Sequence, residues 1–413
     1  MMRRNLDASA EAIGRDIDAL ARITDPGRPW TRRAFSPRFD EGRDHLRRRF
    51  VAGGLQVSTD AGGNLIGLRK GTRPGAGTIM LGSHSDTVPD GGRFDGIAGV
   101  VVALEVARIL ARRGAVLRHD LAVVDFLAEE VSVFGVSCIG SRAMAGVLPQ
   151  DWLGRTSDGR DLARAMADVG GVPESLHGPL RDDLKAFLEL HIEQGPVLEA
   201  ERIGLGIVTA IVGITRVEIV ISGRPDHAGT TPMGLRADAL AASARIVTQI
   251  EARATELSAG PAHFTATVGE FEISPNAANV VPARVRMLVD IRAERARDKE
   301  AFVTWLTGLE AAPGITVETR LISDNPGVGM DDGLQRKLAE AADGLGAACR
   351  RMVSGAGHDA AFMARLCPSA MVFVPCREGR SHCPEEWAET ADLALAAEVL
   401  ANTVMELDRK REG

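Results

Sequence analysis

Two short apolar segments that run directly into histidine or acidic residues constrain the fold of this chain most strongly. Residues 79–81 lead into His84, and residues 121–128 lead into the adjacent pair Glu129 and Glu130. Runs this short and apolar are typical of strands buried inside a sheet. Ligands of open α/β sheets bind outside the carboxyl ends of the strands. Both segments therefore place chemically active side chains at the binding edge of a sheet.

Helical segments alternate with these strands. Residues 97–111 are apolar nearly all round, which predicts a buried helix, and apolar residues recur at helical spacing from Leu6 to Ile23. Residues 186–193 alternate as a strand that carries His191 near its end. Strands that alternate with helices predict an α/β fold whose sheet is covered on both faces.

The pattern changes over residues 212–325. The expected elements are strand 215–221, helix 236–256, strands 263–272 and 284–292, helix 297–311 and strand 315–322. This βαββαβ order predicts a ferredoxin-like domain. The α/β pattern then resumes, so residues 1–211 and 326–413 are predicted to form one domain that is interrupted by an inserted second domain.

Composition excludes several classes of partner. The 413 residues are 45% hydrophobic and 25% charged, with a net charge of −7, which argues against nucleic-acid and anionic-membrane partners. The five cysteines are odd in number and form no CxxC pair, as expected in a reducing compartment. Without an apolar leader or an eighteen-residue apolar run, the protein is expected to be cytoplasmic.

The histidine and acidic residues suffice for two metal ions. Three His, one Asp and one Glu can hold two divalent ions if the Asp bridges them, and His84, His191, His382 and Asp95 belong to such a set. Asp86 could accept the second imidazole N–H of His84 as an outer-shell partner. Asp95 precedes the buried helix and could instead be its N-cap, which is compatible with metal binding.

The pair Glu129 and Glu130 allows two interpretations. Adjacent carboxylates are usually solvated, but a pair that ends an apolar strand should be desolvated and mutually repelling. One Glu would then be a ligand and the other a base with a raised pKa. His191 and Glu193 share one strand face with Gln194 next, a pattern that an ordinary edge-strand face would also give.

Residues of the inserted domain are candidates for substrate contact. His227 lies in a loop rich in Gly and Thr, which indicates close approach to a polar ligand. Arg292 is a natural partner for a substrate carboxylate, or else pairs with Asp290 or Glu294. A further Gly-rich segment, 355–359, is either a helix-entry turn or a substrate loop.

Eight motifs together resemble the hydantoinase/carbamoylase family of metal-dependent amidohydrolases, which is related to aminoacylases and carboxypeptidase-like two-metal peptidases. They are GSHSDTVPDGGRFDG (82–96), FLAEE (126–130), GSRAMAG (140–146), ELHIEQGPVLE (189–199), GRPDHAGTTPMGLRADAL (223–240), AANVVP (277–282), GAGHDA (355–360) and SHCPEEW (381–387). The resemblance implies a mixed-sheet, metallopeptidase-like catalytic domain with the insertion acting as a lid and dimerisation domain. The family commonly has Gly after the Glu pair, where Val131-Ser132-Val133 stands here.

The resemblance also assigns roles. Asp95 would bridge two divalent ions, zinc first, with manganese, cobalt or nickel as alternatives. One ion would be completed by His84 and His191, the other by Glu130 and His382. Glu129 would be the general base, His227 would act beside it in catalysis, and the substrate would be contacted by Gln194, Asn279, Arg292, Gly357 and His358. The protein would be a homodimer.

The implied activity is hydrolysis of the carbamoyl C–N bond of an N-carbamoyl-L-amino acid or a close ureido acid. The products would be amino acid, ammonia and carbon dioxide. Alternatives are an allantoate or β-ureidopropionate amidohydrolase, and an aminoacylase or dipeptidase. A non-catalytic binding protein on the same scaffold would be expected to lack a ligand or the base, yet all are present.

Overall fold

The computed structural model describes residues 7–310 and 312–409, so the expected helix positions Leu6 and Ala311 lie outside the described residues. The chain divides into two compact units. The first comprises the described residues up to Thr209, Met330–Met352, and those from His358 onward. The second comprises Ala210–Gly329 and Val353–Gly357.

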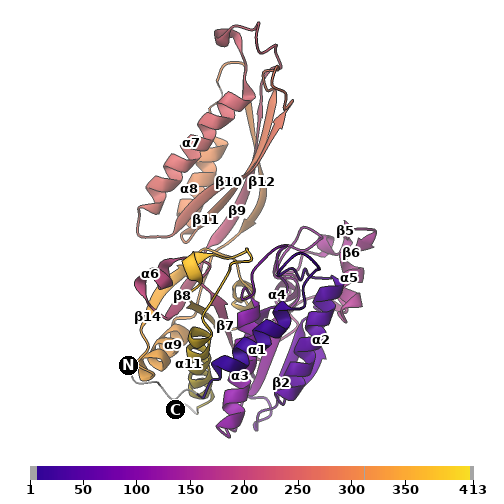
Figure 1. Ribbon diagram of the computed structural model, residues 1–413, viewed down its shortest axis with the longest axis vertical. Helices are drawn as coiled ribbons and strands as arrows, with labels where there is room; N and C mark the ends of the chain where they lie inside the picture. The colour runs from indigo at the N-terminus through magenta and orange to yellow at the C-terminus, as the bar shows by residue number, and fades with distance from the viewer. Residues whose placement is uncertain (1–6, 311, 410–413) are drawn as a thin grey trace. The chain divides into compact units, whose positions relative to one another are not determined.

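A mixed sheet forms the centre of the first unit (Figure 1). Its strands, in spatial order, are β1 (Gln56–Thr59), β2 (Leu65–Arg69), β4 (Asp120–Phe126), β3 (Thr78–His84), β7 (Leu184–Ile192), β15 (Ser369–Val374) and β8 (Leu205–Ile211), with β14 (Cys349–Ser354) also paired to β8. The neighbours β4, β3, β7 and β15 run parallel, whereas β1, β2 and β8 join antiparallel. The expected mixed α/β fold is confirmed.

Helices cover both faces of this sheet. Helix α3 (Ile97–Arg112) packs on β3, β4 and β7 and is itself covered by α11 (Thr390–Asp408). Helix α4 (Ile139–Met144) contacts β4, and α10 (Ala360–Met363) contacts β7 and β15. The other helices are α1 (Ala10–Ala21), α2 (Pro37–Ala52), α5 (Leu162–Asp168), α6 (Val197–Glu201) and α9 (Asp332–Gly344), and a small hairpin joins β5 (Thr156–Ser157) to β6 (Arg160–Asp161). Because α3 lies between sheet and helices, thirteen of its residues are buried.

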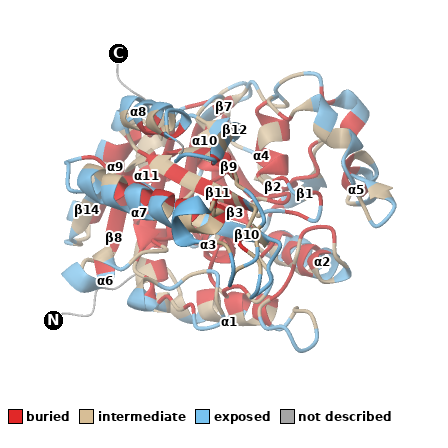
Figure 2. Ribbon diagram, turned by 90° about the horizontal axis from the view of Figure 1, so that it is seen from above, coloured by how far each residue is buried: buried red, intermediate tan, exposed pale blue. Residues whose placement is uncertain are grey.

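The second unit is an antiparallel sheet with two helices. Its elements follow as β9 (Gly213–Ser222), α7 (Ala239–Ser258), β10 (Phe264–Ser274), β11 (Arg284–Ala293), α8 (Ala296–Thr307) and β12 (Thr316–Asn325). The spatial order is β10-β11-β9-β12. The next strand in the chain, β13 (Val328–Gly329), pairs instead with β8 at the end of the mixed sheet. Strand β11 alternates strictly between buried and half-buried or exposed residues, as expected for a sheet with one covered face. Figure 2 shows buried residues concentrated on strands and on the inward sides of helices.

Element ends differ from the sequence expectation at one place that matters for the site. The strand expected over 121–128 stops at Phe126, and Ala128 then has a positive φ of 53°. The turn at Ala128 redirects the chain, so Glu129 and Glu130 lie in a loop beyond the strand. Among the described residues, no helix has both the length and the apolar character needed to cross a membrane.

Candidate metal centre

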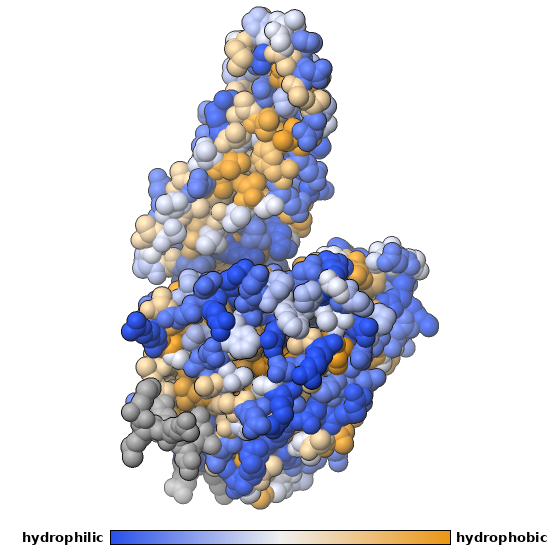
Figure 3. Space-filling view, in the orientation of Figure 1, coloured by the Kyte–Doolittle hydropathy of each residue, from blue (hydrophilic) through white to orange (hydrophobic). Residues whose placement is uncertain are grey.

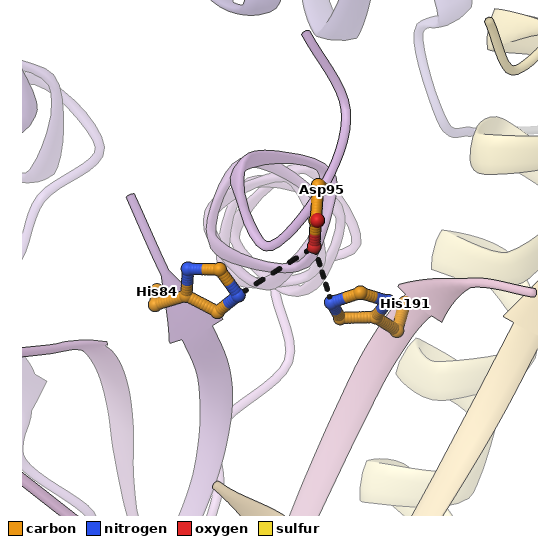
Figure 4. Close-up of side chains that lie close together, drawn as sticks. All are labelled: His84, Asp95 and His191. Carbon is orange, nitrogen blue, oxygen red and sulfur yellow. Dashed lines mark ion pairs between the residues drawn. The ribbon is translucent and has the colours of Figure 1, made fainter. Parts of the chain in front are cut away.

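Two histidines and one carboxylate oxygen form the first cluster (Figure 4). His84 is the last residue of β3, and His191 lies one residue before the end of the neighbouring parallel strand β7. Asp95 comes just before α3, so its carboxylate reaches over the same edge of the sheet. Its Oδ1 lies 3.0 Å from His191 Nε2 and 3.7 Å from His84 Nε2. All three residues are buried.

The second oxygen of Asp95 belongs to a second cluster. Asp95 Oδ2 lies 3.0 Å from His382 Nε2, and that nitrogen lies 3.1 Å from Glu130 Oε1. Each cluster keeps its three candidate ligand atoms within 4.8 Å of one another. One carboxylate therefore directs its two oxygens to two separate groups of donors, which is the arrangement of a bridging ligand.

The ring orientations of His84 and His191 suit metal binding. His84 Nδ1 lies 3.1 Å from the backbone oxygen of Asp86, and His191 Nδ1 lies 3.0 Å from that of Ile192. A carbonyl oxygen can only accept, so each Nδ1 carries the proton and donates it. In the neutral ring each Nε2 is thereby left with a lone pair that faces the cluster, and imidazole and carboxylate donors suit zinc.

Asp86 acts differently from the sequence expectation. Its backbone carbonyl is closer to His84 Nδ1 than its carboxylate, which lies 3.5 Å away. The carboxylate instead accepts the backbone N–H groups of Glu129 and Glu130, at 3.2 and 3.1 Å. Asp86 thus fixes the loop that carries both glutamates.

Glu129 lies beside the first cluster, with Oε2 3.6 Å from His84 Nε2. Burial raises the pKa of Glu129 well above its usual value; His84 opposes that rise, and the neighbouring carboxylates of Glu130 and Asp359 add to it. A carboxyl group that gains affinity for a proton in this way suits proton transfer.

The electrostatics of both clusters favour cations. Burial works against the charged form of Asp95, yet hydrogen bonds to His191 and His382 outweigh it and hold the Asp95 pKa well below its usual range. The pKa of His382 changes in the opposite direction: its hydrogen bonds to Asp95 and Glu130 raise it to about 11. Protons on these imidazoles supply the positive charge that a metal ion would bring, and metal binding would release them.

Glu386 supports the centre and was not assigned a role from the sequence. One of its oxygens accepts the backbone N–H of Phe94 at 2.8 Å and that of Asp95 at 3.0 Å, and the other accepts the hydroxyl of Ser381 at 2.8 Å. Burial and then Asp95 raise its pKa to about 7. This buried carboxylate therefore joins the segment that carries Asp95 to the one that carries His382. The one feature of the sequence that could have suggested a role for Glu386 is its position four residues after the predicted ligand His382.

Two other candidates also lie near the clusters. Gln194 has a positive φ of 56°, and its amide donates to Asp95 Oδ2 and to the Ser381 hydroxyl, both at 3.2 Å. The His358 ring is buried, with its centre 4.5 Å from that of His191. Gly357, by contrast, belongs to the second unit.

The remaining predicted contacts all lie in the second unit. His227 Nδ1 accepts the backbone N–H groups of Gly229 and Thr230, at 3.0 and 3.2 Å, so the neutral ring carries its proton on Nε2. The backbone of Asn279 lies next to it, because the Asn279 carbonyl accepts the N–H of Ala228.

Arg292 forms one of the two ion pairs that its sequence context allowed. Its Nε donates to Asp290 at 2.7 Å, and Nη1 donates to the Gly355 carbonyl at 2.9 Å. These two bonds fix the guanidinium within the second unit.

Comparison with known proteins identifies the family. Residues 80–406 match Peptidase family M20/M25/M40. The chain belongs to this family. Members of it are metal-dependent hydrolases, which agrees with the paired clusters around Asp95.

Individual M20/M25/M40 relatives are similar over nearly their whole length. An N-carbamoyl-L-amino-acid amidohydrolase of Paenarthrobacter aurescens is 38% identical, with 97% of this chain and 99% of that protein covered. The allantoate amidohydrolase of Bacillus subtilis is 36% identical, with 86% and 87% covered. A hydantoinase/carbamoylase family amidase from Burkholderia multivorans has a similar crystal structure, with a TM-score of 0.88, 34% identity and 98% of each chain covered.

Proposed function

We propose that this protein hydrolyses the carbamoyl C–N bond of N-carbamoyl-L-amino acids or close ureido acids. The observation that carries the proposal is the bridging geometry of Asp95, with Oδ1 directed to His191 and His84 and Oδ2 to His382. The likeness to the carbamoyl-amino-acid amidohydrolase of Paenarthrobacter aurescens supports the choice of substrate.

Two divalent ions, zinc first, would be held by His84, Asp95 and His191 and by Asp95, Glu130 and His382. When bound, such a pair lowers the pKa of a shared water and polarises the substrate carbonyl. Manganese, cobalt and nickel would also suit these donors, because ligand identity alone does not select among them.

Glu129 would take the proton of the attacking water. Its position 3.6 Å from His84 and its raised pKa support that role. After attack on the ureido carbon, Glu129 would hand the proton to the departing amine as the C–N bond breaks. The carbamate that leaves would then decompose to ammonia and carbon dioxide.

The second unit would supply binding groups. The Nε2–H of His227 is the donor left after Nδ1 has accepted two backbone N–H groups, so it could stabilise the oxyanion. Arg292 would bind the substrate carboxylate, with Asn279, Gln194, Gly357 and His358 as further contacts.

We further propose that the inserted ferredoxin-like unit is a lid and the site of homodimerisation. Apolar side chains gather on the face of this unit that Figure 3 shows. Its exposed large apolar residues are Met233, Leu235, Phe271, Leu321 and Ile322. Exposed apolar surface of this kind supports a protein contact.

The nearest alternative is an allantoate amidohydrolase, which would use the same groups with a different pocket. The likeness to the Bacillus subtilis enzyme of that name supports this second candidate.

A panel of substrates separates the candidates. Ammonia release would be followed with metal-loaded protein, with and without chelator, on N-carbamoyl-L-amino acids, their D-enantiomers, allantoate, β-ureidopropionate and N-acetyl amino acids. Chelator-sensitive ammonia from the L-carbamoyl compounds is expected. Ammonia from allantoate alone would establish the second candidate, and acetate release without ammonia would move the protein to the aminoacylases.

A further inference from the structure

A pocket of about 940 Å³ lies at the edge of the first unit's sheet opposite the metal ligands. It opens where β3, β4 and β7 begin, at Thr78, Asp120 and Leu184, whereas His84 ends β3. At about 3.3 Å per residue, the seven residues of β3 separate the two edges by roughly 20 Å. The pocket is therefore distinct from the metal centre.

The lining of this pocket is strongly basic. Its charged side chains are Arg73, Arg118, Lys185, Lys337, Arg409 and the single acid Glu406, with His119 beside them. Glu406 is already paired, 2.6 Å from Arg409 and 3.6 Å from Lys337. Within residues 7–310 and 312–409, no carboxylate forms an ion pair with Arg73, Arg118 or Lys185.

Three acidic residues beside the pocket, within the part of the chain that the structure describes, already have partners. Asp120 pairs with Lys70 at 2.8 Å, and Asp183 pairs with Arg181 at 2.6 Å. Asp408 accepts from His119 at 2.8 Å. Several cations thus face one concavity, in a chain whose net charge is −7, and a bound anion would relieve their mutual repulsion.

We propose that this pocket binds a small molecule that carries two or more phosphate groups. Arginine and lysine are the usual partners of phosphate oxygens, and the volume lies within the range of small-ligand sites. A concave site favours a small molecule over the extended backbone of a nucleic acid. Pro74 and Leu407 add apolar surface for an organic group. The proposal is independent of the reaction at the metal centre.

Calorimetric titration of the metal-loaded protein tests this inference. The probes would be ATP and tripolyphosphate, each with Mg²⁺ in excess so that the phosphates do not strip the catalytic metals, and adenosine as the uncharged control. The variant would be Arg73→Glu with Lys185→Glu, two exposed side chains whose exchange should not disturb folding. Arg164→Glu makes the same kind of charge change at an exposed side chain of α5, outside the pocket.

We expect one saturable site for ATP or tripolyphosphate, no binding of adenosine, and affinity reduced about tenfold or more in the double variant but not in Arg164→Glu. Binding of both phosphates would define the ligand by its phosphates, and binding of ATP alone would define it as a nucleotide. No binding, equal binding by the double variant, or binding of adenosine as tight as that of ATP would overturn the proposal. Tight binding of a single-stranded oligonucleotide without the small phosphates would do so too.

Discussion

At the scale of single residues, buried carboxylates outside the two candidate ligand sets organise the centre. Glu386 accepts from Phe94, Asp95 and Ser381, and Asp86 accepts from the backbone of both glutamates. Local sequence could suggest the ligands, because each stands in a recognisable motif. It could not assign these acceptors, because the backbone N–H groups that donate to them lie 43 to 292 positions away in the chain.

Replacing Glu386 should therefore weaken metal binding. Glu386→Ala leaves two backbone N–H groups and one hydroxyl without their acceptor, and we expect a loss of metal affinity of about 10- to 100-fold. Glu386→Gln should restore part of it, since the amide oxygen can accept both N–H groups. Affinity would be measured by competition with a chelating dye. The neighbour Glu385→Ala is the control, because Glu385 is exposed and pairs with Arg380 at the surface. Equal metal affinities in the two Ala variants would refute the role of Glu386.

His45 should make the protein less stable as the pH falls. Burial, followed in the same direction by Arg48 and Arg49, lowers the pKa of this half-buried imidazole, although Asp16 opposes them. The folded state then binds fewer protons than the unfolded state below about pH 6.5, so stability falls as the pH drops through that value. Denaturant midpoints at pH 7.5 and 5.5 should differ less in His45→Gln than in the unchanged protein. The exposed His177→Gln serves as control and should leave the difference as it was.

At the scale of elements, the start of α3 shapes the first cluster. Gly96 has a positive φ of 65°, and a Cβ placed there would lie 2.4 Å from His84 Nε2. The helix can begin this close to the sheet only because that residue has no side chain. The tight approach is what positions Asp95 over both histidines.

Gly96→Ala should consequently abolish tight metal binding. Gly114, just beyond the other end of α3, has a similar φ of 61° with nothing near its Cβ position. Gly114→Ala should cost about 1 kcal/mol of stability from backbone strain alone and leave metal content unchanged. Metal content after dialysis and melting curves would be measured for both variants. Together they separate the effect of backbone strain at a positive φ from the effect of the clash between the new Cβ and His84. Full metal content in Gly96→Ala would contradict this account of the helix start.

At the scale of the whole molecule, the ligands join distant parts of the chain. His84, Asp95, Glu130, His191 and His382 come from five segments of the first unit. Alternation of strands and helices predicted an α/β fold, and the family resemblance implied that its sheet is mixed. Strands β1, β2, β8 and β14 were not predicted from the sequence. Of these, β1 and β14 contain few buried residues and so carry no clear apolar pattern.

Removal of metal should lower the melting temperature. Bound ions stabilise the folded state in proportion to the logarithm of their concentration over Kd, and without them the carboxylates of the centre repel one another. We expect a decrease of several degrees on treatment with chelator, reversed by zinc or manganese. Scanning calorimetry before and after reconstitution measures it. An unchanged melting temperature in protein shown to have lost its metal would contradict the idea that bound metal stabilises the fold by linking these five segments.

The central claim is that Glu129 is the base of a two-metal hydrolytic site, and Glu129→Gln tests it most directly. Turnover of an N-carbamoyl-L-amino acid would be measured together with metal content on the same preparations. We predict two metal ions per chain in both proteins and a loss of turnover of about 100-fold or more in the variant. Turnover near that of the unchanged protein, with both metals in place, would show that another group takes the proton.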